Sequence, residues 1–233
     1  MSSSASLIAK SYPRIGLVSG WGYPSDCWPE PQPELAGAVQ FFSWQSLLAP
    51  RATALAAKAD DIEFWVGWSL GGSVLMHALA QQQIKARGLL LLSATPCFCQ
   101  QADGWPGMAE AQLVALQHAV ARNPTAALRQ FYRAFALTPP PEYQSVPEQL
   151  ANSVGLEFLR QQDLRAELTR LSQTTDVAVL TASDDPLVSP NWPEHSDARL
   201  RWAVVPNQGH DWPQTPDCYR WMIEQLFNSN GSV

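Results

Sequence analysis

The chain has 233 residues, of which 46% are hydrophobic and 15% are charged. This length allows one sizeable hydrophobic core, and the low charged fraction is typical of a globular chain rather than a disordered one. The formal net charge of -6 argues against a dedicated nucleic-acid-binding protein, because such proteins carry basic surfaces. No apolar run approaches the roughly 18 residues that a membrane-spanning helix needs, and no signal-peptide pattern opens the sequence. We therefore expect a cytoplasmic protein that does not bind membranes or nucleic acid.

The first part of the sequence alternates short apolar runs with helix-like segments. Four apolar runs predict strands, at residues 15–19, 38–42, 62–66 and 88–93. The Ala/Leu-rich segment 46–58 and the segment 73–80 predict helices. The run at 88–93 is continuously apolar, as a parallel strand buried on both faces requires. This alternation predicts an α/β fold with a mostly parallel, doubly wound sheet.

The strand pattern stops at residue 96 and is replaced by helix-like segments separated by proline-rich breaks. We expect helices at residues 109–121, 125–136, 147–160 and 164–171. These segments predict an all-helical insertion, residues 96–171, over the carboxyl edge of the sheet. An insertion at this place suits a lid that shapes a pocket.

The strand–helix pattern then resumes. Residues 177–181 and 200–205 predict two more strands, and residues 216–227 predict a closing helix. We therefore expect one α/β core made from residues 1–95 and 172–233, with the helical insertion between the two parts.

The sequence Gly67-Trp68-Ser69-Leu70-Gly71 stands between a predicted strand and a predicted helix. In a Gly-x-Ser-x-Gly turn of this kind the serine is held in a strained conformation at the end of a sheet, where its hydroxyl is exposed for nucleophilic attack. The two glycines have no Cβ atoms that would clash across so sharp a bend. We interpret Ser69 as a nucleophile; the alternative is a plain strand-to-helix turn.

A serine hydroxyl needs a histidine to take its proton and a carboxylate to orient that histidine. After such a turn the expected chain order is serine, acid, histidine. His210 follows the last predicted strand, so it should lie at the same edge of the sheet as Ser69. A capping or solvent-exposed role is the alternative. We expect His77 to pack behind the turn, His118 to belong to the lid and His195 to lie in a surface loop.

Two adjacent carboxylates, Asp184 and Asp185, follow the strand before His210. Only one of them can face the imidazole ring. We prefer Asp185, because Asp185-Pro186-Leu187-Val188 resembles the hydrolase pattern Gly-x-x-Asp-Pro-x-Val, with Ala182 at the glycine position. Asp184 stays as the alternative, and the aspartate that is not used would be a turn former or a solvated charge.

An oxyanion hole needs two backbone N–H donors directed at the charge that develops in the transition state. One should come from Leu70, the residue after the proposed nucleophile, and the other from Trp21 in the loop after the first strand. Most hydrolases of this type carry His-Gly in that loop, whereas this chain has Ser19-Gly20. A backbone N–H donor is unaffected by this difference, but Ser19 cannot make the side-chain hydrogen bonds that a histidine could make there.

The four cysteines do not predict a metal site. Cys97 and Cys99 form one Cys-x-Cys pair, but no second pair or nearby histidine completes a set of ligands. Cys27 and Cys218 stand apart. We expect all four to be buried or half-buried free thiols.

Several segments together resemble one family, the pimeloyl-[acyl-carrier protein] methyl ester esterases of biotin synthesis, which have the α/β-hydrolase fold. The matching segments are residues 20–22, 67–72, 95–98, 105–108, 155–159 and 163–165. The similarity runs from residue 15 to the final helix and includes the lid. Lid motifs are more informative than a serine–histidine–acid set, because unrelated esterases share that set.

The resemblance implies hydrolysis of the methyl ester on a carrier-bound pimeloyl chain, with an acyl-enzyme intermediate and without a metal or organic cofactor. Ser69 would be the nucleophile, His210 the base and Asp185 the acid. The chain departs from the family pattern in its short amino-terminal region and at Ser19. A serine esterase for another short acyl ester is the first alternative, and a non-catalytic binding module with this fold is the second.

The resemblance also implies a transient partner, the acidic acyl-carrier protein. We expect the chain itself to be a monomer. Arg122, Arg129 and Arg133 lie in the predicted lid helices, and the last two share a helix face at i,i+4 spacing. These arginines are candidates for carrier docking. A solvated helix face explains them equally well.

The candidate acyl-binding residues are aromatic. Phe131 and Phe135 share a lid-helix face, and we expect them to line the acyl channel together with Trp21. Packing of the lid against the body of the protein is the more common use of such a pair.

Overall fold

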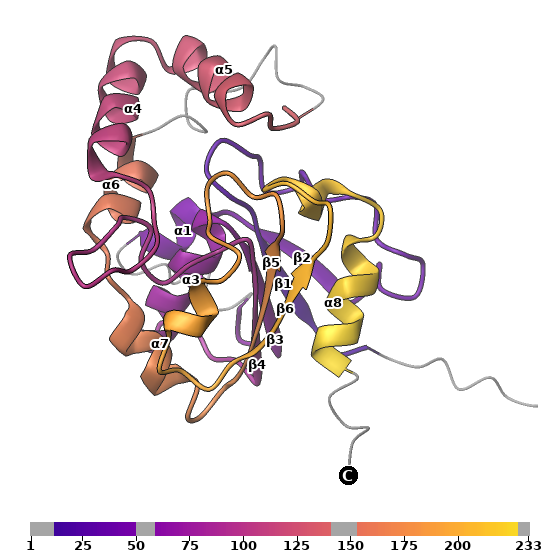
Figure 1. Ribbon diagram of the computed structural model, residues 1–233. Helices are drawn as coiled ribbons and strands as arrows, with labels where there is room; N and C mark the ends of the chain where they lie inside the picture. The colour runs from indigo at the N-terminus through magenta and orange to yellow at the C-terminus, as the bar shows by residue number, and fades with distance from the viewer. Residues whose placement is uncertain (1–11, 50–58, 141–152, 228–233) are drawn as a thin grey trace, which may run out of the picture.

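The computed structural model describes residues 12–49, 59–140 and 153–227, which contain a six-stranded parallel sheet with helices on both faces (Figure 1). In spatial order the strands are β2 (Val39–Phe42), β1 (Ile15–Val18), β3 (Phe64–Trp68), β4 (Gly88–Leu92), β5 (Asp176–Ala182) and β6 (Arg201–Val205). All five strand pairings are parallel. The predicted doubly wound α/β architecture is therefore confirmed.

The direction in which the chain adds strands reverses between β1 and β3. From β1 the chain goes to β2 on one side and then to β3 on the other. In open α/β sheets ligands bind at the carboxyl ends of the strands at such a switch point. The register pairs Val18 with Gly67, so the loop that follows β1 and the turn that follows β3 emerge side by side.

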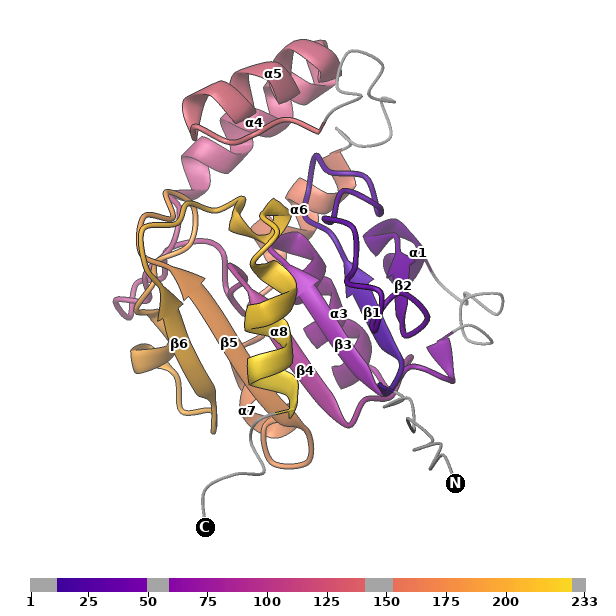
Figure 2. The same ribbon diagram turned by 90° about the vertical axis from the view of Figure 1, so that its right-hand side faces the viewer.

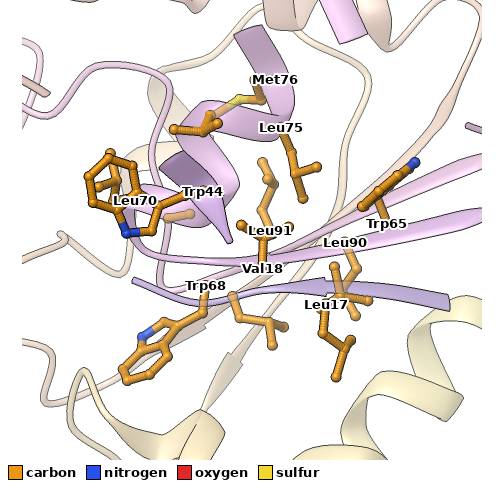
Figure 3. Packing of buried hydrophobic residues seen from close by; sticks show 14 of the residues in the cluster. Leu17, Val18, Trp44, Trp65, Trp68, Leu70, Leu75, Met76, Leu90 and Leu91 are labelled. Carbon is orange, nitrogen blue, oxygen red and sulfur yellow. The ribbon is translucent and has the colours of Figure 1, made fainter. Parts of the chain in front are cut away.

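The central strands are apolar along their whole length because both faces of the sheet are covered. Every residue of β1, β3 and β4 is buried. Successive side chains point to opposite faces, so Leu91 packs toward α3 (Leu70–Ala80) and Leu90 points to the other side (Figure 3). Leu75 and Met76 of α3 complete the packing on the first face.

Within the described residues, three helices cover one face of the sheet and one covers the other. The first three are α1 (Trp44–Leu48), α3 and α7 (Arg165–Leu171), of which α1 and α7 each pack against α3, and the fourth is α8 (Cys218–Phe227) (Figure 2). The helix predicted at 46–58 begins at Trp44, and residues 50–58 lie outside the described residues. The helix predicted at 164–171 thus packs against α3 beside the sheet and not over its edge.

The other predicted lid helices lie beyond the carboxyl ends of the strands, where α4 packs against both α5 and α6 (Figures 1 and 2). They are α4 (Glu110–Arg122), α5 (Pro124–Ala134) and α6 (Ser153–Gln161). The chain breaks between α4 and α5 at Asn123, whose side chain accepts the N–H of Ala126 at 3.0 Å and caps α5, with Pro124 at its first position. Residues 147–152 of the third predicted helix lie outside the described residues. The bounds of the lid insertion stay a prediction.

A polar network joins α4 to α6. The Arg160 guanidinium pairs with Glu157 at 2.6 Å on its own helix and with Glu110 of α4 at 2.8 Å. The Gln117 amide of α4 donates to Glu157 at 2.7 Å. Because these groups are partly exposed to solvent, each pair adds little to stability, but together they connect the two helices above the sheet.

Candidate active site

Ser69 occupies the sharp turn between β3 and α3. β3 ends at Trp68, α3 begins at Leu70, and Ser69 has φ of 54° and ψ of -125°. A positive φ is uncommon for a residue with a side chain, and it persists only where the surrounding structure imposes it. The turn holds the serine side chain up at the carboxyl edge of the sheet, above the amino terminus of α3.

The two glycines that flank the turn allow close backbone contacts. A Cβ atom at Gly67 would lie 2.4 Å from Cα of Gly72, and one at Gly71 would lie 2.3 Å from the carbonyl oxygen of Val18. Both distances are far below van der Waals contact. The Gly-x-Ser-x-Gly pattern therefore has a steric cause in this chain.

His210 lies between Ser69 and Asp185. Its Nε2 is 2.8 Å from Ser69 Oγ, and its Nδ1 is 2.8 Å from Asp185 Oδ2 and 3.0 Å from Oδ1. The side chains of His210 and Asp185 are 3% and 0% exposed. A carboxylate facing Nδ1 favours the tautomer with the proton on Nδ1, which leaves Nε2 to accept the serine proton.

Of the two adjacent carboxylates, Asp185 is the one that faces the imidazole ring. Its Oδ1 also accepts the backbone N–H groups of Leu187 at 2.8 Å and Val188 at 3.0 Å. Burial raises the pKa of Asp185, but the charge and hydrogen bond of His210 and the two N–H groups outweigh burial, so its pKa lies below the ordinary value. Asp184 is exposed and accepts a hydrogen bond from the Ser183 hydroxyl at 3.2 Å.

Further hydrogen bonds connect the segments that carry the three residues. The indole N–H of Trp68, next to Ser69, donates to the carbonyl oxygen of His210 at 2.9 Å. The Asp184 N–H donates to the carbonyl oxygen of Gln208 at 2.9 Å, which joins the acid loop to the histidine loop. The spacing of the three side chains is thus supported by their own backbone segments.

The loop after β1 passes over Ser69. A Cβ atom at Gly20 would lie 3.0 Å from Ser69 Cβ and 3.6 Å from Ser69 Oγ, and Trp21 follows directly. Leu70 is the first residue of α3, and the first four N–H groups of a helix have no carbonyl partner within that helix. Trp21 and Leu70 therefore belong to the two segments next to Ser69, and their role as oxyanion donors stays a prediction.

Ser19 orders the same loop by a short local contact. Its buried hydroxyl donates to the carbonyl oxygen of Tyr23 at 3.3 Å. Most hydrolases of this type have a histidine at the position of Ser19. In this chain the hydroxyl–carbonyl bond within the loop takes the place of the hydrogen bonds that a histidine could make there.

A cavity of about 270 Å³ opens above Ser69 and His210. Its lining is almost entirely apolar and comes mainly from α4, α5 and α6, with Met108, Leu113, Leu116, Leu156, Leu159 and Leu187 among its residues. Trp21, Phe131 and Phe135 line it as well. The ring of Phe131 meets Trp21 edge-on, with centroids 5.0 Å apart, and lies 5.3 Å from Phe135. Such a cavity suits an apolar acyl chain whose end reaches Ser69.

The three candidate docking arginines lie outside this cavity. Arg122 at the end of α4, and Arg129 and Arg133 on α5, are exposed and are not among the lining residues. They lie on α4 and α5, two helices that line the cavity with other residues. This position is compatible with carrier docking and equally with a solvated helix face.

The other histidines are not part of the cavity lining. His77 packs edge-on against Phe158 of α6, with ring centroids 5.5 Å apart, and His118 and His195 are exposed. Within the described residues no group of three or more His, Cys, Asp or Glu side chains could hold a metal ion. No helix in the same part of the chain is long and apolar enough to cross a membrane.

All four cysteines are free, as expected. Cys97, Cys99 and Cys218 are buried and Cys27 is half-buried. Burial raises the pKa of Cys97 to about 11 and that of Cys27 to about 12. These thiols are therefore protonated and poorly reactive near neutral pH.

Two contacts at the site were not anticipated from the sequence. One is the Trp68 bond to His210, and the other is the Tyr132 hydroxyl, which donates to the carbonyl oxygen of Gly22. Trp68 occupies a variable position of its motif, and Tyr132 is 110 residues away from its partner. Neither carries a local sequence signal.

No protein-family model matches the chain. Curated relatives match it with substantial coverage. A protein of Serratia marcescens is 31% identical over 180 residues, covering 67% of this chain and 70% of the relative. One of Methylococcus capsulatus is 28% identical over 230 residues and 88% of each chain. One of Nitrosomonas europaea is 31% identical over 160 residues, and this chain spans 62% of its length. All three are named pimeloyl-[acyl-carrier protein] methyl ester esterase.

Solved structures resemble the fold at low sequence identity. A hydrolase from Oleispira antarctica gives a TM-score of 0.72 at 14% identity, covering 91% of this chain and 90% of the other. An esterase from Exiguobacterium antarcticum gives 0.69 at 19% identity, covering 95% and 93%. Together with the parallel sheet and the turn at Ser69, this likeness confirms the predicted α/β-hydrolase fold.

Proposed function

Because this chain belongs to the family of pimeloyl-[acyl-carrier protein] methyl ester esterases, we propose that it is a serine carboxylesterase that removes the methyl group from a carrier-bound pimeloyl methyl ester during biotin synthesis. The observation that carries the proposal is the hydrogen-bonded series Asp185–His210–Ser69 at the floor of an apolar cavity. An apolar chain with a reactive ester at its end fits that arrangement.

In the first half of the proposed reaction, Ser69 Oγ attacks the ester carbonyl carbon while His210 Nε2 takes the serine proton. The backbone N–H groups of Trp21 and Leu70 stabilise the oxyanion that forms. Asp185 stabilises the imidazolium ring but does not take its proton. His210 then protonates the departing methoxide, so methanol leaves and the acyl chain stays on the serine as an ester.

In the second half, a water molecule replaces methanol. His210 removes a proton from the water, which attacks the acyl-enzyme carbonyl carbon, and the same proton returns to Ser69 Oγ as the bond to the serine breaks. The net change is one ester and one water giving one carboxylic acid and one methanol. These two half-reactions require no redox step and no metal ion.

The cavity lining supports a substrate with several methylene groups. Burying one methylene is worth about 0.8 kcal/mol, so a pimeloyl chain gains binding energy here that an acetyl group cannot. Trp21, Phe131 and Phe135 would contact that chain. This observation favours a medium-length acyl ester over the shortest ones.

The acyl-carrier protein would be a transient partner of a cytoplasmic monomer. Exposed Arg122, Arg129 and Arg133 on α4 and α5 are the proposed docking groups, because opposite charge accelerates encounter with an acidic carrier. No step of the chemistry depends on them.

Complementation tests the specific substrate. A bacterial strain that lacks its own biotin-pathway esterase should grow without biotin when it expresses this chain, and should not grow with Ser69→Ala. If the wild-type chain hydrolyses p-nitrophenyl acetate but does not restore growth, the protein is an esterase for another acyl ester. If a fluorophosphonate probe does not label the wild type, or still labels Ser69→Ala, the chain is a binding module and not a serine hydrolase.

A further inference from the structure

Helix α5 and the residues after it contact both loops that surround Ser69. We call residues 19–23 the oxyanion loop and residues 207–214 the histidine loop. The first contains Trp21, and the second contains His210. Both loops emerge from the carboxyl edge of the sheet, and α5 lies beyond that edge (Figure 2) and contributes residues to the cavity lining.

The contact with the oxyanion loop is close and includes a directed hydrogen bond. Tyr132 is buried, and its hydroxyl donates to the carbonyl oxygen of Gly22. A Cβ atom at Gly22, where φ is +84°, would lie 2.8 Å from Cδ1 of Leu128, so α5 packs directly on this peptide. Phe131, on the same face of α5 as Leu128 and Tyr132, packs edge-on against the ring of Trp21. The backbone around Trp21 therefore rests against one face of α5.

The contact with the histidine loop is made through the backbone of Thr138, shortly after α5. Its N–H donates to Asp211 Oδ2 at 2.7 Å. Its carbonyl oxygen accepts the Gln214 amide at 3.3 Å and the Tyr23 hydroxyl at 3.0 Å. Both polar groups of one peptide segment are thus held by side chains of the two loops, and Asp211 is the direct neighbour of His210.

We propose that Tyr132 and Asp211 are positioning residues, through which α5 and Thr138 hold the oxyanion loop and the histidine loop at the spacing that ester hydrolysis needs. Neither touches the reacting atoms. Tyr132 acts through the Gly22 peptide on Trp21, and Asp211 acts through its own backbone on His210. The inference rests on the serine-esterase chemistry proposed above.

Contacts that only position a loop can affect the rate because catalysis is sensitive to small displacements. A shift of about 1 Å in a catalytic group can cost about a hundredfold in rate. The Tyr132 bond crosses 110 residues of sequence and the Thr138–Asp211 bond crosses 73. Other hydrogen bonds, such as Ser19 to Tyr23 and Trp68 to His210, still hold the two loops, so we expect the loss of these contacts to shift the loops and not to unfold them.

Tyr219 provides a matched control for Tyr132. It is also buried, and its hydroxyl donates to the carbonyl oxygen of Pro29 at 3.0 Å, outside both loops. Tyr132→Phe and Tyr219→Phe each remove one buried hydroxyl and one hydrogen bond to a carbonyl. A general loss of stability affects both variants, whereas a positioning role affects only the first.

The experiment uses p-nitrophenyl acetate, whose acyl group is too short to depend on filling the cavity. We expect Tyr132→Phe to lower kcat by about tenfold, less than the direct loss of an oxyanion donor, while KM changes less than about twofold. The rate of fluorophosphonate labelling of Ser69 should fall in parallel. Tyr219→Phe should keep kcat within about twofold of wild type, with thermal unfolding midpoints measured for both.

Asp211 gives a second, independent comparison. We expect Asp211→Ala to lower kcat by about tenfold, and Asp211→Asn to recover most of that loss because its amide oxygen still accepts the Thr138 N–H. The proposal is overturned if Tyr132→Phe and Asp211→Ala keep wild-type kcat, or if Tyr219→Phe loses as much as Tyr132→Phe. An inactive wild type would instead reject the proposed function, so the two failures are distinguishable.

Discussion

The floor and the roof of the cavity are built in different ways. The floor consists of Ser69, Asp185 and His210, which follow the parallel strands β3, β5 and β6, and steric and backbone constraints set its geometry. The roof consists of α4, α5 and α6, which are fixed by side-chain contacts between residues far apart in sequence. We therefore expect substitutions of the cavity-lining side chains of the roof to change acyl preference more than the chemistry at Ser69, whereas loss of the α5 contacts to the two loops should lower the rate itself.

The largest expected effect is on the floor. Asp185→Asn should lower kcat by about 10⁴, because an amide facing Nδ1 no longer favours the tautomer that lets Nε2 accept the serine proton. Asp184→Asn is the matched control, since its side chain is exposed, and it should stay within about twofold of wild type. Steady-state hydrolysis of p-nitrophenyl acetate measures both. A larger loss in Asp184→Asn would show that the acid is misassigned.

A roof substitution should separate long from short acyl chains. Phe135→Ala removes an aromatic wall of the cavity and should lower kcat/KM for a pimeloyl methyl ester by about tenfold, the scale on which a hydrophobic pocket discriminates. The acetyl ester should change by less than about twofold. Competition assays with the two esters measure the ratio of their kcat/KM values directly. Equal losses on both would mean that Phe135 supports the fold and not acyl selection.

A smaller effect is expected on the outer surface of the roof. Arg129→Glu with Arg133→Glu should lower kcat/KM for the carrier-bound ester by several-fold to about tenfold, most strongly at low ionic strength, and spare a small soluble ester. The pair Arg199→Glu with Arg220→Glu makes the same change in net charge at other exposed positions. If that pair causes the same loss, overall charge and not local docking is responsible.

The smallest expected effect is at Ser19. Ser19→Ala removes the hydroxyl bond to the Tyr23 carbonyl and should lower the free energy of unfolding by about 1 kcal/mol. Denaturant titration measures this change. We expect kcat to stay within about twofold, because α5 holds the same loop from the other side. A large kcat loss would mean that Ser19, and not the roof, orders the oxyanion loop.

Much of the floor was predictable because its signals are local. The apolar runs predicted the strands, since buried parallel strands have no polar face. The Gly-x-Ser-x-Gly turn located Ser69, because only glycine tolerates the approach to Val18 and Gly72. The order serine, acid, histidine selected His210, since all three loops leave the same edge of the sheet. The sequence alone could only favour Asp185 over Asp184, because neighbouring loop residues point in directions that depend on tertiary contacts.

The roof was less predictable because the contacts that position it join residues far apart in sequence. Helical periodicity located α4 and α5, and the break at Asn123 has a capping residue followed by proline. Periodicity does not say what a helix packs against, so the position of α7 beside α3 was missed. The Tyr132 and Thr138 contacts join residues far apart in sequence, and one sequence without relatives has no pattern that marks such pairs.

The most direct test of the proposed function is intact mass spectrometry of an acyl-carrier protein that bears the pimeloyl methyl ester, incubated with the purified chain. We expect the wild type to convert the carrier-bound methyl ester to the free acid and to leave the thioester to the carrier intact, whereas Ser69→Ala converts none. No conversion by the wild type, equal conversion by Ser69→Ala, or release of the whole acyl chain from the carrier would contradict it.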